Sequence, residues 1–205
     1  QAVALDQAGL HAEAEASYRL SLESQGPDGD WADPQGWGHQ MWGIPGWKAW
    51  AALEHYRLSG DRGYLERVYP RLVAASRFQE RQRARTRVTA EDGERPVTYG
   101  LMPRGQGDAG LMDDHDFHGV FFPHNIWAVT ADRLAVEAAE ILGRTEDLPE
   151  LRAILSRALT DLVIALDRGA IEAEGYRWIP GVAGKTSGSR WGAVYAAHPC
   201  GILPL

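Results

Sequence analysis

The sequence has little cysteine, no long apolar run and no excess of positive charge. Its only cysteine is Cys200, so an intrachain disulfide is excluded and the compartment stays undetermined, with the cytoplasm slightly favoured. No apolar segment approaches the roughly 20 residues that a membrane-spanning helix needs. Residues 1–25 are rich in Ala and Glu, unlike a signal peptide. Together with a net charge of −7, these absences predict a soluble protein that binds neither nucleic acid nor membrane.

The composition is that of a folded domain of moderate size. Of the 205 residues, 44% are hydrophobic and 24% are charged, which is enough apolar material for a sizeable core. The chain starts with Gln1 rather than Met and stops at Leu205, soon after a new apolar segment begins. We therefore expect residues 1–205 to be one partial domain, truncated at both ends, of a longer protein.

Hydrophobic periodicity and helix breakers predict an all-α fold. The expected helices are 2–25, 44–59, 61–84, 123–143, 147–170 and 190–198. Short links join the second helix to the third and the fourth to the fifth, whereas the other connections, 26–43, 85–122 and 171–189, are long. Because a short link requires antiparallel neighbours, the long connections should all lie at one end of the helices. Such a loop surface usually carries the binding or active site.

The helices also divide into two kinds. Residues 147–166 have a single apolar stripe, typical of an outer helix, whereas residues 126–142 and 47–58 are apolar nearly all round, typical of buried helices. This alternation suits a double ring of helical hairpins, and an irregular helical bundle is the alternative. Gly60 and Gly143 are placed to end helices in the left-handed conformation. Asp147, followed by Glu150, is expected to cap the fifth helix.

The first long loop has the side chains of a sugar-binding site. Indole faces stack on the apolar face of a sugar ring, and polar groups bond its hydroxyls. The candidate ligand contacts are Trp31, Trp37, His39, Gln40 and Trp42. The alternative is that the tryptophans fill core and that Pro27-Asp28-Gly29 is only a turn.

The second long loop, which leads into the fourth helix, is the richest in potential chemistry. Asp114 and Asp116 are the first candidates for a catalytic carboxylate, with Asp108 behind them, because paired carboxylates serve as acid and base when their pKa values differ. The candidate substrate contacts around them are His115, His118, His124, Asn125 and Trp127. Each aspartate could instead be a capping or turn residue. The histidine spacing matches no metal motif, so we expect neither a metal nor another cofactor.

The third long loop adds a further carboxylate and more aromatic and cationic side chains. Glu174 is the last catalytic candidate. Trp178, Arg190 and Trp191 are further candidate substrate contacts. If the loops converge, these residues face the candidates of the other two loops.

Several runs of residues resemble the six-hairpin glycosidase superfamily, which has an (α/α)6 toroid and includes glucoamylase-, trehalase- and rhamnosidase-like enzymes. The runs are WAALEHYRLSGDR (50–62), LERVYP (65–70), YGLMP (99–103), HNIWA (124–128), AEILGR (139–144) and WGAVYAAHPCGIL (191–203). The resemblance implies an incomplete toroid, about half of the ring, whose remainder would come from the rest of the parent chain. It matches no acid or base motif residue by residue.

The leading functional hypothesis is therefore a glycoside hydrolase that acts on an oligosaccharide or glycoside. One carboxylic acid would protonate the glycosidic oxygen, and a second carboxylate would activate water or attack carbon. Two alternatives stay open. One is a non-catalytic carbohydrate-binding module that uses the same tryptophan-rich face. The other is a toroid lyase or epimerase in which His115, His118 or His124 transfers protons.

Overall fold

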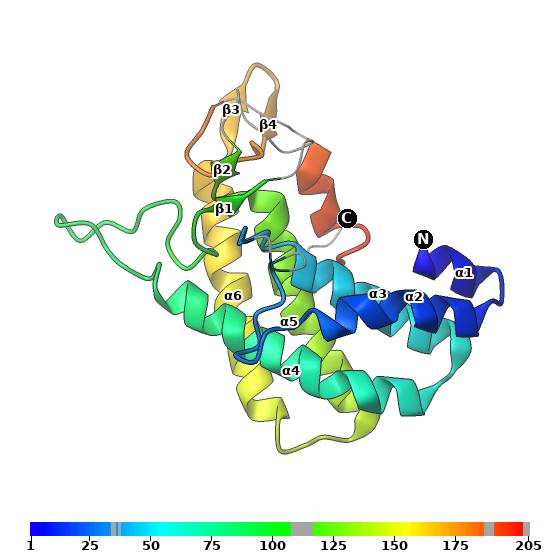
Figure 1. Cartoon of the computed structure of the whole chain (residues 1–205). Coiled ribbons are helices and arrows are strands. Elements are labelled where there is room, and N and C mark those ends of the chain that lie inside the picture. The colour runs from blue at the N-terminus through cyan, green and yellow to red at the C-terminus, as the bar shows by residue number, and fades with distance from the viewer. Residues whose placement is uncertain (34–35, 37, 108–116, 187–190, 203–205) are drawn as a thin grey trace.

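The computed structural model describes residues 1–33, 36, 38–107, 117–186 and 191–202, with only the backbone of Trp191. The helices are α1 (Ala2–Gln7), α2 (His11–Glu23), α3 (Ile44–Ser59), α4 (Arg62–Ala84), α5 (Phe122–Leu142), α6 (Leu148–Gly169) and the 3₁₀ helix η2 (Trp191–Ala196). The strands form two small hairpins, β1 (Gly105–Gln106) with β2 (His118–Gly119) and β3 (Ile171–Ala173) with β4 (Tyr176–Trp178). The predicted all-α class is confirmed, because the strands are only two or three residues long (Figure 1).

The four long helices were predicted to within one residue at each end. The prediction of one helix over residues 2–25 is wrong. It is divided at Gly9, whose φ of 78° lies in the left-handed region and turns the chain back on itself. The last predicted helix, 190–198, is present as the shorter 3₁₀ helix η2.

The helices form three antiparallel hairpins, α1–α2, α3–α4 and α5–α6, each closed by a tight link. The first helices of these hairpins pack side by side in chain order, α1 on α3 and α3 on α5, and η2 continues the row by packing on α5. The second helices lie behind them, with α4 packed against both α5 and α6. The described helices are thus arranged in two layers, and the tight links share one end of them (Figure 1).

Glycine and aspartate fix the ends of the tight links. Gly60 and Gly143 have φ values of 72° and 71°, so the predicted left-handed C-caps are confirmed. Asp61 caps α4 by accepting a hydrogen bond from the Tyr64 amide at 2.9 Å. The predicted cap at Asp147 is wrong, since its side chain makes no capping bond to α6. Its carboxylate accepts from the Tyr69 hydroxyl at 2.6 Å instead, which ties α4 to the α5–α6 link.

Helix α5 is surrounded by the other helices, as its sequence predicted. Even its charged Asp132 is fully buried, at 0% exposure. The Asp132 carboxylate accepts hydrogen bonds from the Ser76 hydroxyl at 2.7 Å and from the Arg83 guanidinium at 2.5 Å, both on α4. A buried charge needs such a partner, because an unpaired carboxylate would lose its hydration without compensation.

Helix α3 packs against α1, α2, α4 and α5 but has one open side, so the prediction that it is buried all round is wrong in part. Ala49, Ala52 and Leu53 face the core, whereas Trp47 and Trp50 are only partly buried. Close to its start, α3 touches α5 directly. A Cβ atom on Gly46 would lie 2.1 Å from the Trp127 carbonyl oxygen, so only glycine allows this approach. The open side of α3 bounds the cavity described below.

Candidate functional site

The predicted convergence of the three long loops at one end of the helices is confirmed. The first and second loops are joined by a hydrogen bond of 2.9 Å from the Gln106 amide to the Gln40 carbonyl. The second and third loops are joined by an antiparallel bridge between Phe121 and Val182. Figure 1 shows both small hairpins at this end, away from the tight links. The sequence elements that carry the candidate residues therefore lie together in space.

Glycines allow the loops to approach so closely. A Cβ atom on Gly105 would lie 2.4 Å from the Gln40 carbonyl oxygen. A Cβ atom on Gly107 would lie 2.5 Å from the ring of Phe121. Both distances are shorter than any side chain tolerates, so larger residues at these positions would separate the loops. Gly107 also donates a hydrogen bond of 2.8 Å to the Phe117 carbonyl.

Several of the predicted site residues lie outside the part of the chain that the structure describes. They are Trp37, Asp108, Asp114, His115, Asp116, Arg190 and the side chain of Trp191. Their proposed roles as catalytic carboxylates or substrate contacts stay predictions from the sequence. The described residues on either side of the aspartate-rich segment are held in place, because β1 pairs with β2.

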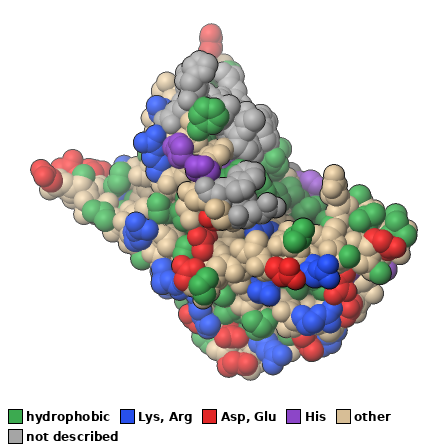
Figure 2. Space-filling model, in the orientation of Figure 1, with side chains coloured by type: hydrophobic (Ala, Val, Ile, Leu, Met, Phe, Trp, Pro, Cys, Tyr) green, Lys and Arg blue, Asp and Glu red, His purple; other side chains and the backbone are tan. Residues whose placement is uncertain are grey.

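Two predicted contacts, His39 and His118, lie next to each other at this end. His39 comes from the first loop and His118 from β2, and their ring centroids are 6.4 Å apart. Both side chains are exposed, and Figure 2 shows histidines grouped on the surface at the loop end. Close by, the Gln40 amide donates to the Asp30 carboxylate at 2.9 Å, so its orientation is fixed. The surface here offers imidazoles, an amide and a carboxylate to a polar ligand.

Two tryptophans of the first loop are core residues, as the alternative interpretation had it. Trp31 is 1% exposed and donates its indole N–H to the Ser21 carbonyl at 2.7 Å. Trp42 is 5% exposed and packs against Phe78, with ring centroids 6.3 Å apart. Neither has an indole face open to a ligand, and we leave both out of the proposed site.

Asn125 serves the loops rather than a ligand. Its side-chain oxygen accepts from the Met102 amide at 2.7 Å, and its side-chain nitrogen donates to the Phe121 carbonyl at 2.8 Å. Both bonds are buried. Asn125 therefore holds residues on both sides of the β1–β2 hairpin at the start of α5.

A group of aromatic rings lies under the loops. Trp127 contacts Trp47 at 6.2 Å and Tyr195 at 5.6 Å between ring centroids, and we call these three residues the aromatic wall. His124, one turn before Trp127 on α5, is buried and meets Trp47 edge to face at 6.2 Å. It also packs tightly on Gly43, whose Cβ would lie 3.1 Å from the imidazole. The wall thus connects the predicted contacts His124 and Trp127 to α3 and η2.

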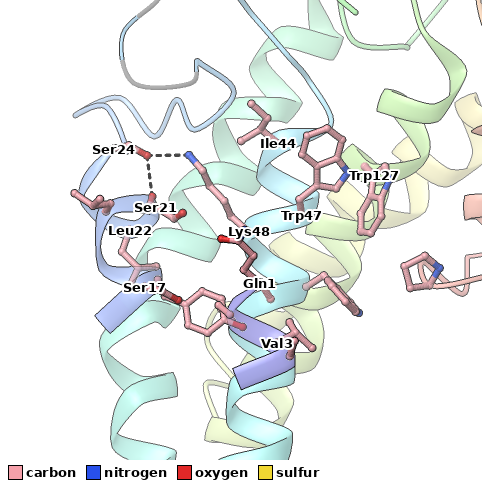
Figure 3. Close-up of a pocket in the computed structure, with 18 of the residues that line it drawn as sticks. Gln1, Val3, Ser17, Ser21, Leu22, Ser24, Ile44, Trp47, Lys48 and Trp127 are labelled. Carbon is pink, nitrogen blue, oxygen red and sulfur yellow. Dashed lines mark hydrogen bonds between the residues drawn. The ribbon is translucent and has the colours of Figure 1, made fainter. Parts of the chain in front are cut away.

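The aromatic wall forms one side of a cavity of about 850 Å³ on the open side of α3 (Figure 3). The opposite side is formed by α1 and α2, and Ile44, Ala51 and Trp50 of α3 also line the space. Figure 3 shows Lys48 turned toward α2, while Trp47, its neighbour in sequence, is turned toward Trp127. The cavity therefore has an aromatic half beside the loops and a more polar half between α2 and α3.

Lys48 is the charged residue of the polar half. Its ammonium group donates to the Ser24 hydroxyl at 2.8 Å and to the Trp31 carbonyl at 3.2 Å. Burial lowers the pKa of Lys48 to about 8, although the nearby carboxylates of Asp30 and Asp33 oppose this change. An amine in this setting is charged at neutral pH but only weakly stabilised in that form.

The third loop contributes less than expected within the described residues. Glu174 is exposed in the turn between β3 and β4. Trp178 is partly buried and pairs across the hairpin with Ile171. An exposed turn carboxylate lacks the enclosed surroundings of a ligand site, so Glu174 is the weakest of the catalytic candidates.

Sequence reasoning missed four of the cavity residues: Trp47, Lys48, Trp50 and Tyr195. The spacing of Trp47 and Trp50, three apart on a helix, was a usable signal because such residues share one face. It was interpreted as core packing alone. The missed signal at Lys48 is a cation in a helix that is otherwise apolar over most of its surface.

Within the described ranges, no three His, Cys, Asp or Glu side chains form a group that could hold a metal ion. None of the helices in those ranges combines the length and apolar character that a membrane crossing requires. No protein-family model matches the chain, and no curated protein matches it either.

Proposed function

We propose that this chain is part of a glycoside hydrolase of the α/α-toroid type, acting on an oligosaccharide or glycoside. The observation that carries the proposal is the meeting of three long loops beside the aromatic wall, at one end of helical hairpins arranged in two layers. Consecutive hairpins with their first helices in one row are the arrangement that a toroid repeats. Further hairpins from a longer chain would complete the ring.

The chemistry of the site supports a sugar ligand. An indole presents a flat apolar face that stacks on the C–H face of a pyranose, and the partly buried Trp47, in contact with the buried Trp127, supplies such a side chain at the cavity surface. His39, His118 and Gln40 supply hydrogen-bonding groups at the loop end. The carboxylates that hydrolysis requires would be Asp114 and Asp116, with Asp108 as the next candidate.

The test is hydrolysis of a panel of aryl glycosides and oligosaccharides by the full-length protein and by the separate variants Asp114→Asn and Asp116→Asn. A catalytic acid or base should lose on the order of 10²-fold or more in turnover with an unchanged melting temperature. Glu13→Gln is the matched control, because Glu13 is an exposed carboxylate on α2. Full turnover in both aspartate variants, or unfolding of both, contradicts the assignment. Binding without turnover favours a carbohydrate-binding module.

One observation favours a second candidate, a lyase or epimerase on the same scaffold. His39 and His118 lie 6.4 Å apart between ring centroids on the loop surface, a spacing at which two imidazoles can act on one substrate. Elimination would create an unsaturated sugar that absorbs in the ultraviolet, whereas hydrolysis would not. Loss of such a product in His118→Gln, with Asp114→Asn and Asp116→Asn still active, would favour this candidate over the hydrolase.

A further inference from the structure

Lys48, in the second turn of α3, is the only charged side chain among the described residues that line the cavity. The chain has one other lysine, Lys185, which is exposed in the third loop. The groups that hold the Lys48 amine belong to the end of α2 and to the first loop, so the amine lies between α2, α3 and that loop. A lysine in such a place differs chemically from one in water, because burial disfavours the charged form of an amine.

The hydrogen bonds of Lys48 match a neutral amine. Its Nζ donates to the Ser24 hydroxyl at 2.8 Å and to the Trp31 carbonyl at 3.2 Å. The Ser24 hydroxyl donates its own hydrogen to the Ser21 carbonyl at 2.8 Å, so toward Lys48 it acts only as an acceptor (Figure 3). A neutral amine has two hydrogens and one lone pair, whereas an ammonium group has three hydrogens. The two described acceptors therefore satisfy the neutral form and leave its lone pair uncommitted.

The charges around Lys48 agree with this hydrogen bonding. Burial lowers the pKa of Lys48 to about 8, and the carboxylates of Asp30 and Asp33 oppose this change only in part. Within the described residues these carboxylates accept hydrogen bonds from the Gln40 side chain and the Gly38 amide instead of pairing with the amine. At pH 7.5 about a quarter of the molecules would have a neutral Lys48 amine, against about one in a thousand for a lysine at the ordinary pKa of 10.5.

The cavity has room for a ligand that reaches this amine. Its volume of about 850 Å³ lies within the range of small-molecule sites in proteins. Trp47, Trp50 and Ala51, on the same helix as Lys48, line it with aromatic and apolar surface. None of its described lining residues carries a carboxylate, so no negative charge among them competes for the amine. Such a space suits a molecule with an aromatic or apolar body and a polar end that meets Lys48.

We propose that Lys48 forms an imine with an aldehyde or ketone that enters the cavity on an aromatic or apolar body. A neutral lysine in an apolar pocket is the form that attacks a carbonyl group. The Nζ lone pair forms a bond to the carbonyl carbon, and the carbonyl oxygen gains a proton as the nitrogen loses one. Water then leaves with the second hydrogen of the amine, and a C=N bond remains, so that neither oxidant nor reductant is required. This site goes beyond the proposed action on carbohydrates and does not depend on it.

The experiment treats the full-length protein with benzaldehyde and sodium cyanoborohydride at pH 7.5. The hydride converts the imine into a stable benzylamine, and peptide mass spectrometry measures the rate of labelling at each lysine. Lys48 should be labelled at least about tenfold faster than the exposed Lys185, because a far larger fraction of its amine is neutral. Equal rates at the two lysines, or slower labelling of Lys48, overturn the proposal.

A blocking variant shows whether the carbonyl compound reaches Lys48 through the cavity. Ser21→Trp fills the space on the α2 side and should slow labelling of Lys48 at least about tenfold while Lys185 is unaffected. Arg19→Trp is the matched control, since the Arg19 side chain is 74% exposed on α2, and it should leave both rates intact. If Ser21→Trp does not fold, Ala51→Phe blocks the cavity from the α3 side. Unchanged labelling of Lys48 in a folded blocking variant overturns the proposal.

Discussion

Helices α3 and α5 are both rich in apolar residues but have very different surroundings. Both are apolar over most of their circumference, yet α5 is enclosed by α3, α4, α6 and η2, whereas α3 has an open side that lines a cavity. A charge in such an enclosed place is stable only when it is paired, and Asp132 on α5 has three α4 partners in Ser76, Gln79 and Arg83. The open side of α3 instead leaves a cation, Lys48, and two indoles, those of Trp47 and Trp50, at the surface of the cavity.

The largest effect is expected from unpairing the buried charge of α5. Arg83→Met leaves the Asp132 carboxylate buried without its cation, and should reduce the free energy of unfolding by about 3–5 kcal/mol. Denaturant unfolding at pH 7 measures this. Arg81→Met is the control, because Arg81 is exposed on the same helix and, within the described residues, donates to the Asp28 carbonyl and lies over the Phe78 ring without pairing with a carboxylate. A loss of less than about 1 kcal/mol in Arg83→Met would mean that α5 is not enclosed as described.

The next effect concerns the contact that joins the two helices. Gly46→Ala would place a Cβ 2.1 Å from the Trp127 carbonyl oxygen, so α3 must move away from α5, at a cost of roughly 1–3 kcal/mol or more. Gly63→Ala on α4 is the matched substitution. Its Cβ would meet the Asp61 carboxylate at 3.3 Å and the Arg67 guanidinium at 3.6 Å, both on side chains that can shift, and the gain in helix propensity should stabilise the protein by roughly 0.5–1 kcal/mol. A lower melting temperature for Gly46→Ala together with a higher one for Gly63→Ala would confirm the close α3–α5 contact. A change in the same direction for both variants would refute it.

A smaller effect on stability, which depends on pH, is expected from Lys48 on the open side of α3. The pKa of Lys48 falls to about 8 in the folded protein, below its ordinary value of 10.5, so the unfolded chain binds more protons between these values. The stability of the wild type should therefore rise relative to Lys48→Met as the pH increases from about 8 to about 10.5. Below pH 8 the difference in the free energy of unfolding between the wild type and Lys48→Met should be constant. A difference that falls over the alkaline range would show that Lys48 has a partner stabilising its charge.

The sequence predicted the long helices because their signals are local and repeated. The apolar stripe of α6 and the glycines at positions 60 and 143 determine where helices run and end, whatever surrounds them. Gly9 was missed because alanines continue on both sides of it, and its turn depends on α2 packing back against α1. The strands were missed because two- or three-residue pairings depend on contacts between loops distant in sequence.

The sequence predicted where the candidate site lies, but not which of the residues there are open to a ligand. The alternation of short and long links was enough to predict that the loops meet at one end of the helices. Burial could not be inferred for individual loop residues, so Trp31 and Trp42 were assigned to a ligand although they fill the core. Likewise, helical periodicity cannot show which apolar face stays open, and the cavity residues Trp47, Trp50 and Tyr195 were therefore missed.

The central claim is that the loop end and the aromatic wall together bind a carbohydrate. Amide hydrogen exchange followed by mass spectrometry, with and without each sugar of the hydrolysis panel, tests it most directly. The account predicts that a bound oligosaccharide slows exchange in residues 39–47 and 117–127, while the tight-link end at 57–64 stays unchanged. Slowed exchange confined to the tight-link end, or no change with any sugar of the panel, would contradict it.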